Sequence, residues 1–135
     1  MKAVLFDTFG TVADWRGSIT GMGEQIAKEK SIKNIDWGTF ANAWRAGYRP
    51  GMTRVQSGVC PWTSINIIHR ERLDQILIDF GIAKVLTEEE KIDLNFFWHH
   101  PDPWPDSLPR LLRLKQLYLI GPLSNWEPRS TFFHG

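Results

Sequence analysis

Two short apolar runs near opposite ends of the sequence constrain the fold more than any other feature. Residues Ala3 to Phe6 form one run, which stops at Asp7, and Leu117 to Leu123 form the second. Continuous apolar runs of this length are typical of strands buried on both faces of a parallel sheet. We therefore expect an α/β protein in which residues 2–10 and 116–124 contain neighbouring parallel strands.

The sequence between the two runs has a helical pattern. Apolar residues recur at helical spacing within 21–30, 36–45 and 65–80, where Asp36 is placed to cap the second helix and Gly81 to end the third. Thr87 and Glu90 have the spacing of a capping box, which predicts a helix through Phe97. Breaks are expected at 49–51 and 58–61.

A proline-rich segment ends the helical tract. Three prolines lie between Pro101 and Pro105, and Ser107 is placed to cap a short helix before the second apolar run. The order strand, helices, proline-rich segment, helix, strand predicts a sheet core with a helical insertion. We expect residues 1–14 and 100–135 to form the partial core and residues 15–99 to form a helical cap.

Composition excludes several functional classes. The 135 residues carry 16 Lys and Arg against 15 Asp and Glu, so the net charge of +1 argues against nucleic acid or an anionic membrane surface as a partner. The single cysteine, Cys60, excludes an intramolecular disulfide, and the tandem His99 and His100 lack the spacing of a metal site. No targeting segment or membrane span is visible, which predicts a cytoplasmic protein.

Asp7 is the strongest candidate for chemistry. It lies where the first apolar run gives way to Gly10 and Thr11, and ligands of open α/β sheets bind at the carboxyl ends of strands. A carboxylate there can act as a nucleophile that forms an ester intermediate. It can equally cap the turn, and spacing alone does not separate the two interpretations.

The string FDTFGTVADWR, from Phe6 to Arg16, resembles the first motif of the haloacid dehalogenase-like superfamily, and within it the L-2-haloacid dehalogenases. The resemblance implies that Asp7 is the nucleophile and that Thr8, Phe9 and Thr11 contribute to substrate binding. Phosphatases of this superfamily have a second aspartate, a general acid, where this chain has Phe9. A halide leaving group needs no proton, so Phe9 favours dehalogenation.

Three further segments are similar to that family. Ala43-Trp44-Arg45 resembles its cap helix, which implies that Arg45 stabilises the departing halide as an always-charged donor. Residues 105–108 resemble the return from cap to core, and residues 119–125 resemble the second motif, which implies that Ser124 and Asn125 hold the substrate carboxylate. The implied substrate is a short 2-haloacid, with no cofactor and no metal.

The resemblance breaks after Asn125. The resemblance implies two further motifs after the second, one with a lysine and one with an acidic residue, and neither has a match in this sequence. Lys115 does not match the lysine, because it precedes Ser124 instead of following it. We therefore expect a C-terminally truncated dehalogenase with impaired turnover. The alternatives are an inactive fragment that acts only through association and, less favoured, a phosphatase. An incomplete core also predicts an open sheet edge and self-association as a homo-oligomer.

Overall fold

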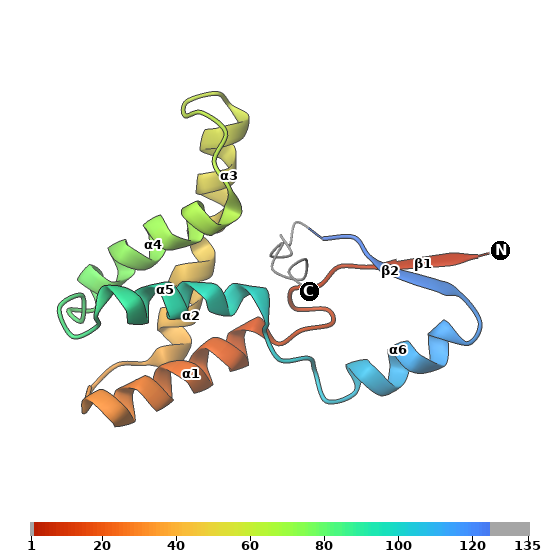
Figure 1. Cartoon of the computed structure of the whole chain (residues 1–135), viewed down its shortest axis with the longest axis horizontal. Coiled ribbons are helices and arrows are strands. Elements are labelled where there is room, and N and C mark those ends of the chain that lie inside the picture. The colour runs from red at the N-terminus through yellow and green to blue at the C-terminus, as the bar shows by residue number, and fades with distance from the viewer. Residues whose placement is uncertain (1, 125–135) are drawn as a thin grey trace, which may run out of the picture.

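The computed structural model describes residues 2–124 of the chain. Helices α1 to α5 form one body, and a two-stranded sheet with α6 forms another, with two chain segments crossing between them (Figure 1). In chain order the elements are β1 (Ala3–Phe6), α1 (Trp15–Lys30), α2 (Trp37–Ala46), α3 (Tyr48–Gln56), α4 (Ile65–Asp79), α5 (Glu88–Phe96), the 3-10 helix η1 (Phe97–His99), α6 (Ser107–Lys115) and β2 (Leu119–Pro122).

The sheet confirms the predicted pairing of the two apolar runs. Strands β1 and β2 are parallel, in a register that places Ala3 opposite Leu119 and Phe6 opposite Pro122. Because parallel strands need a crossover connection, everything between them, including the whole helical body, forms that connection. The carboxyl ends of both strands therefore lie at one edge of the sheet, where Asp7 and Ser124 follow them. The α/β fold class is confirmed.

The strands are less buried than their composition predicts. Phe6 and Ile120 lie on the face toward Leu111 of α6 and share a cavity with it. On the other face, Leu5 and Leu119 are 58% and 57% exposed. The expectation that the first strand is buried on both faces is therefore wrong for residues 2–124, because α6 covers one face of the sheet.

The helical body has a continuous apolar core that combines aromatic and aliphatic residues. Trp37, Phe40 and Trp44 lie at helical spacing along α2 and are all buried, and Trp98 of η1 is 2% exposed. The predicted caps are confirmed: Asp36 accepts a hydrogen bond from the Gly38 amide at the start of α2, and Thr87 and Glu90 form the capping box of α5.

Two local predictions are wrong. The chain does not break at 49–51, because α3 runs through this segment with Pro50 in its first turn, where a missing amide hydrogen costs no helical hydrogen bond. The break lies instead at Gly47, which ends α2 and precedes α3. Ser107 does not cap α6 but is its first residue, and its hydroxyl donates to the Val12 carbonyl at 2.7 Å.

The two segments that connect the bodies are hydrogen-bonded to each other. The Asp14 amide donates to the Asp102 carbonyl at 2.8 Å, and the Trp104 amide donates to the Val12 carbonyl at 3.0 Å. Ser18 extends this contact, since its hydroxyl accepts from the Asp102 amide at 3.0 Å and donates to the Asp14 carbonyl at 2.6 Å. These bonds hold the outgoing and returning chain side by side where they leave the helical body.

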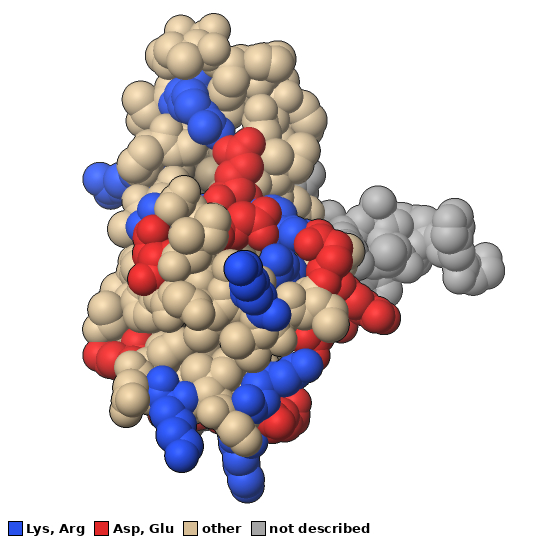
Figure 2. All heavy atoms as spheres, turned by 90° about the vertical axis from the view of Figure 1, so that its left-hand side faces the viewer, with Lys and Arg blue, Asp and Glu red and all other residues tan. Residues whose placement is uncertain are grey.

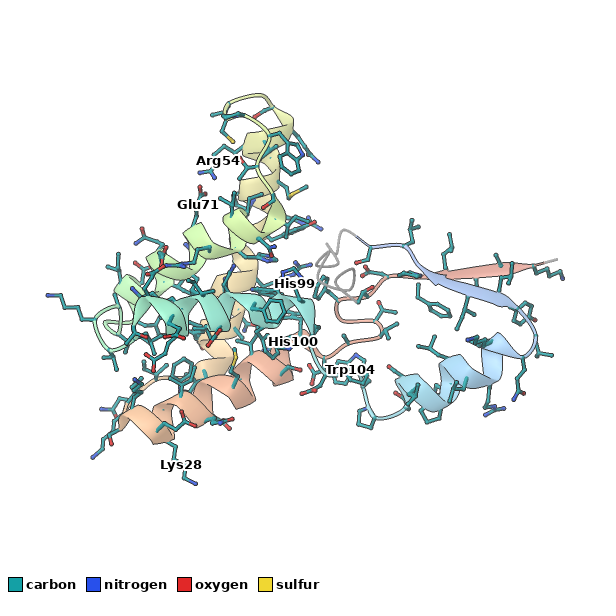
Figure 3. The ribbon with its side chains drawn as sticks, in the orientation of Figure 1. Lys28, Arg54, Glu71, His99, His100 and Trp104 are labelled. Carbon is teal, nitrogen blue, oxygen red and sulfur yellow. The ribbon has the colours of Figure 1, made fainter. Side chains whose placement is uncertain are left out.

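The outer end of the helical body has a mixed surface charge. Figure 2 shows Lys and Arg side chains interspersed with Asp and Glu on this face. Several are paired between neighbouring elements, as with Arg54 and Glu71, which point toward each other between α3 and α4 (Figure 3). Within residues 2–124, no helix combines the length and the apolar character that a membrane crossing requires.

Ser18 provides a test of the connection between the bodies. Ser18→Ala removes the buried acceptor of the Asp102 amide, so we expect the free energy of unfolding to fall by about 1–3 kcal/mol. Thr20→Ala is the matched control, because the Thr20 hydroxyl makes the same kind of bond to a carbonyl four residues earlier but has no partner outside α1. Chemical denaturation of both variants measures the difference, and equal losses would contradict a connecting role for Ser18.

Candidate active site

A compact loop carries Asp7 from the end of β1 toward the helical body. The amides of Val12 and Ala13 both donate to the Thr8 carbonyl at 3.0 Å, and the Gly10 amide donates to the Ala13 carbonyl at 2.9 Å. Gly10 has a φ of +83°, a conformation that L side chains rarely adopt and that glycine adopts without strain. The glycine in the sequence motif is therefore required by the turn that follows Asp7.

A cavity of about 200 Å³ lies where this loop meets the helical body. It collects four of the residues predicted from the sequence, from three separate parts of the chain. The residues around it are Asp7, Phe9, Arg45, Tyr48, Ile65, Asn66, His69, Trp98, His99 and Ser124. One acidic side chain, one cationic side chain and several neutral donors thus face a space large enough for a small organic acid.

Arg45 enters the cavity among aromatic rings. Its guanidinium carbon lies 4.5 Å from the ring centre of Tyr48, 5.7 Å from that of Phe9 and 6.0 Å from that of Trp15. Burial lowers the pKa of Arg45, while Tyr48 and the Asp7 carboxylate act in the opposite direction. An arginine keeps its charge in proteins, so the cavity holds a partly desolvated cation on an aromatic wall.

His69 is the most buried polar residue of the cavity. It is 3% exposed, and its ring stacks on Trp98 with 4.5 Å between ring centres. Among residues 2–124, neither ring nitrogen has a hydrogen-bond partner. Burial, together with the charges of Arg45 and His99, lowers the pKa of His69 from 6.5 to about 3. The ring is therefore neutral at physiological pH, with one N–H donor and one acceptor nitrogen.

A second polar pair lies on the same wall. His99 Nε2 and Asn66 Oδ1 are 2.6 Å apart, and the Asn95 side-chain amide donates to the Asn66 carbonyl at 3.1 Å. Figure 3 shows His99 and His100 at the end of the helical body nearest the strands, and of these two only His99 lines the cavity. Among residues 2–124, no group of three or more His, Cys, Asp or Glu could hold a metal ion.

The structure brings together some of the predicted site residues and separates others. Asp7, Phe9, Arg45 and Ser124 meet at the cavity, whereas Thr8 lines the separate cavity beneath the sheet. Thr11 is exposed and does not line the Asp7 cavity, and Asn125 lies outside the described residues.

The sequence analysis missed several members of this wall, namely Ile65, Asn66, His69 and Trp98, and assigned no site role to Tyr48 or His99. One signal for His69 was present in the sequence. Ile65 and Leu73 lie four residues to either side of it, so His69 falls on the apolar face of α4.

Solved structures of known proteins resemble this chain over nearly all of its length. The defluorinating L-2-haloacid dehalogenase Rha0230 matches with a TM-score of 0.84 and 40% identity, over 98% of this chain and 54% of its own. The L-2-haloacid dehalogenase PA0810 matches with a TM-score of 0.81 and 35% identity, over 94% and 53%. No family model and no curated protein sequence matches the chain.

A more distant structure has the same fold. The L-2-haloacid dehalogenase from Xanthobacter autotrophicus with chloropropionic acid covalently bound matches with a TM-score of 0.73 and 22% identity, over 95% of this chain and 48% of its own. The chain therefore spans about half the length of the solved proteins that it matches.

The parallel strands, the inserted helices and an aspartate directly after the first strand give the chain a haloacid dehalogenase-like α/β fold. Within that class, the chain resembles the L-2-haloacid dehalogenases, as its first motif predicts.

The depressed pKa of His69 makes a prediction about acid stability. Below its ordinary pKa of 6.5 the unfolded chain binds a proton at His69 that the folded chain excludes down to a pKa of about 3. The free energy of unfolding should therefore fall with decreasing pH across this window, by up to about 1.4 kcal/mol per pH unit from this group. His69→Phe removes the titration and keeps a ring against Trp98, so its denaturation midpoint should depend less on pH. An unchanged slope would contradict a buried neutral histidine.

Proposed function

We propose that the chain is a hydrolase of the 2-haloacid dehalogenase type, acting on short 2-haloalkanoic acids. The observation that carries this proposal is the cavity that joins the Asp7 carboxylate to the Arg45 guanidinium on an aromatic wall. The 40% identity to a defluorinating L-2-haloacid dehalogenase supports it and adds 2-fluoroacids to the substrates worth testing.

The proposed reaction proceeds in two steps. An Asp7 carboxylate oxygen attacks carbon 2 of the substrate in line with the carbon–halogen bond, and the halide leaves with the bonding electron pair. The resulting ester is then cleaved by water, which releases the 2-hydroxy acid and a proton and restores the carboxylate. No metal and no cofactor enters this scheme.

Arg45 is proposed to receive the leaving halide. A halide gains negative charge as the bond breaks, and a fixed cation aimed at that position stabilises the transition state more than the ground state. The rings of Phe9 and Tyr48 beside the guanidinium replace water around it, which strengthens its attraction for an anion.

Ser124 and Asn125 are proposed to hold the substrate carboxylate, together with main-chain amides after Asp7. The Ser124 hydroxyl is buried beside the cavity and has no hydrogen-bond partner in the described part of the chain, which supports its assignment to a ligand there. Thr8 and Thr11 are proposed to act through the loop, because the Thr8 carbonyl closes the turn that positions Asp7.

Residues 15–99 are proposed to act as the cap over this site. They contribute Arg45, Tyr48 and His69 to the cavity, while Asp7 and Ser124 come from the strand ends. A phosphatase function is less favoured, because Phe9 presents a ring toward Trp98 where a phosphatase of this class would need a carboxylic acid.

Asp7→Asn tests the nucleophile. No lysine lines the cavity among the described residues, so we expect slow turnover that depends on Asp7. Chloride release from L-2-chloropropionate, without added magnesium, should fall in Asp7→Asn by several orders of magnitude or below detection. Equal, non-zero rates in the two proteins would contradict the assignment. Phosphatase activity lost on adding a chelator would favour the alternative instead.

Arg45→Lys tests the halide assignment while keeping the charge. Lysine lacks the planar fork that stacks on Tyr48, so we expect kcat/KM for L-2-chloropropionate to fall about tenfold to a hundredfold. Arg49→Lys is the matched control, because Arg49 is an exposed neighbour that does not line the cavity. Similar losses in both variants would show that the effect is not specific to the cavity.

A second candidate role is association through the exposed sheet face. Leu119 pairs with Ala3 and Leu5 pairs with Gly121, so both leucines lie on the same face of the sheet, and both are more than half exposed. Leu117 and Leu123 are 76% and 68% exposed. Apolar surface of this kind marks interaction sites. Sedimentation of the purified chain at increasing concentration tests it, and a monomer throughout would count against a homo-oligomer.

A further inference from the structure

Beyond Asp7 and Arg45, we infer that His69 is a specificity-determining residue whose ring N–H donates a hydrogen bond to the halide leaving the cavity. This inference rests on the proposed dehalogenase function and assigns a role to a residue outside the sequence motifs. The juxtaposition that carries it is a buried imidazole on the same cavity wall as Arg45, with no hydrogen-bond partner for either ring nitrogen among the described residues.

Within residues 2–124, the contacts that hold the ring of His69 in place involve neither of its nitrogens. Trp44 Nε1 donates to the main-chain carbonyl of His69 at 2.9 Å, which fixes the backbone of α4 against α2. The ring itself packs on Trp98, with ring planes 24° apart. Neither nitrogen takes part in this support, so the polar atoms serve no structural purpose that the described residues reveal.

Burying a polar ring without partners is costly. Buried donors and acceptors in folded proteins nearly always have partners, and each unsatisfied group loses its hydrogen bonds to water. An apolar residue at this position on the apolar face of α4 would avoid that cost. His69 lines the same cavity as Asp7 and Ser124. A ligand bound in this cavity would therefore supply the missing hydrogen-bond partner of the His69 ring.

The neighbours of His69 indicate what kind of ligand this is. Tyr48 contacts both His69 and Arg45, with its ring centre 6.0 Å from that of His69 and 4.5 Å from the Arg45 guanidinium. Arg45 disfavours a second positive charge on this wall, so His69 presents a neutral N–H beside a cation. A small anion between them would accept from both, whereas a cation would be repelled by Arg45.

The halide fits this position better than the substrate carboxylate does. The halide forms next to Arg45 in the proposed reaction, and Ser124 lies at the strand end, where the carboxylate is proposed to bind. A hydrogen bond to a halide is strongest for fluoride, the smallest and most charge-dense member of the series. Loss of the His69 donor should therefore affect carbon–fluorine substrates more than carbon–bromine substrates.

Halide binding without turnover is the first test. Histidine side-chain NMR of the 15N-labelled chain, titrated with sodium fluoride and with sodium bromide, should show one histidine N–H signal that shifts with saturation and is absent in His69→Phe. Affinity for fluoride should fall about tenfold or more in His69→Phe and much less in His69→Gln, whose side chain retains an N–H donor. His100→Phe, an exposed histidine outside the cavity, should bind as the wild type does.

Turnover is the second test, and it separates this inference from the proposed function. In His69→Phe, the kcat/KM ratio of 2-fluoropropionate to 2-bromopropionate should fall about tenfold, with partial recovery in His69→Gln. Asp7-dependent halide release that is equal in wild type and His69→Phe for both substrates would overturn the role of His69 and leave the dehalogenase function standing.

The opposite failure is also distinguishable. Halide binding that shifts the His69 signal, in a chain that releases no halide from any substrate, would support the anion site and count against the dehalogenase function. Halide binding that neither shifts the His69 signal nor weakens in His69→Phe would overturn the inference, as would the absence of any halide binding.

Discussion

The aromatic packing around Trp98 is the contact on which the site depends. Its ring meets Phe9 at 5.8 Å and Trp15 at 6.1 Å, and it also contacts Trp44 and His69. Phe9 belongs to the loop after β1, whereas the other partners belong to helices. One fully buried ring thus joins the loop that carries Asp7 to the helical body that carries Arg45. Apolar burial on this scale is the main stabilising term in a small protein.

Hydrogen bonds between the two connecting segments fix the relative position that this apolar contact leaves open. Ring packing tolerates sliding, but the paired segments near Asp14 and Asp102 have a fixed register, with Ser18 bonded to both. These bonds fix the position of Asp7 relative to Arg45. The catalysis proposed for Asp7 and Arg45 needs both groups held within a fraction of an ångström. Each of the two groups is attached to a body, and several hydrogen bonds fix the connection between the bodies.

The cavity wall combines groups that are unfavourable to bury. Arg45 is partly desolvated among aromatic rings, and His69 is neutral. In the described part of the chain, the ring nitrogens of His69 have no hydrogen-bond partner. Such features lower stability unless a ligand compensates for them, which is why perturbed groups in a cavity mark functional sites. The same wall therefore accounts for the proposed halide position and for the expected loss of stability in acid.

Local sequence determined much of the secondary structure and the part of the site that follows β1. The apolar runs predicted both strands, Asp36 and the Thr87 capping box predicted helix starts, and the motif after β1 predicted Asp7 and Gly10. These features follow from interactions within a few residues, which a sequence pattern records directly.

The tertiary structure decided what no local pattern contains. Pro50 is tolerated because Gly47 supplies the break before it, and Ser107 bonds across to Val12 instead of capping its own helix. The sequence pattern of α4 places His69 on the apolar face of that helix, as expected of a core residue. His69 lines a cavity because η1, α2 and the loop that carries Asp7 pack around it. Contacts between residues distant in sequence depend on how whole elements pack, and spacing along the chain carries no record of that packing.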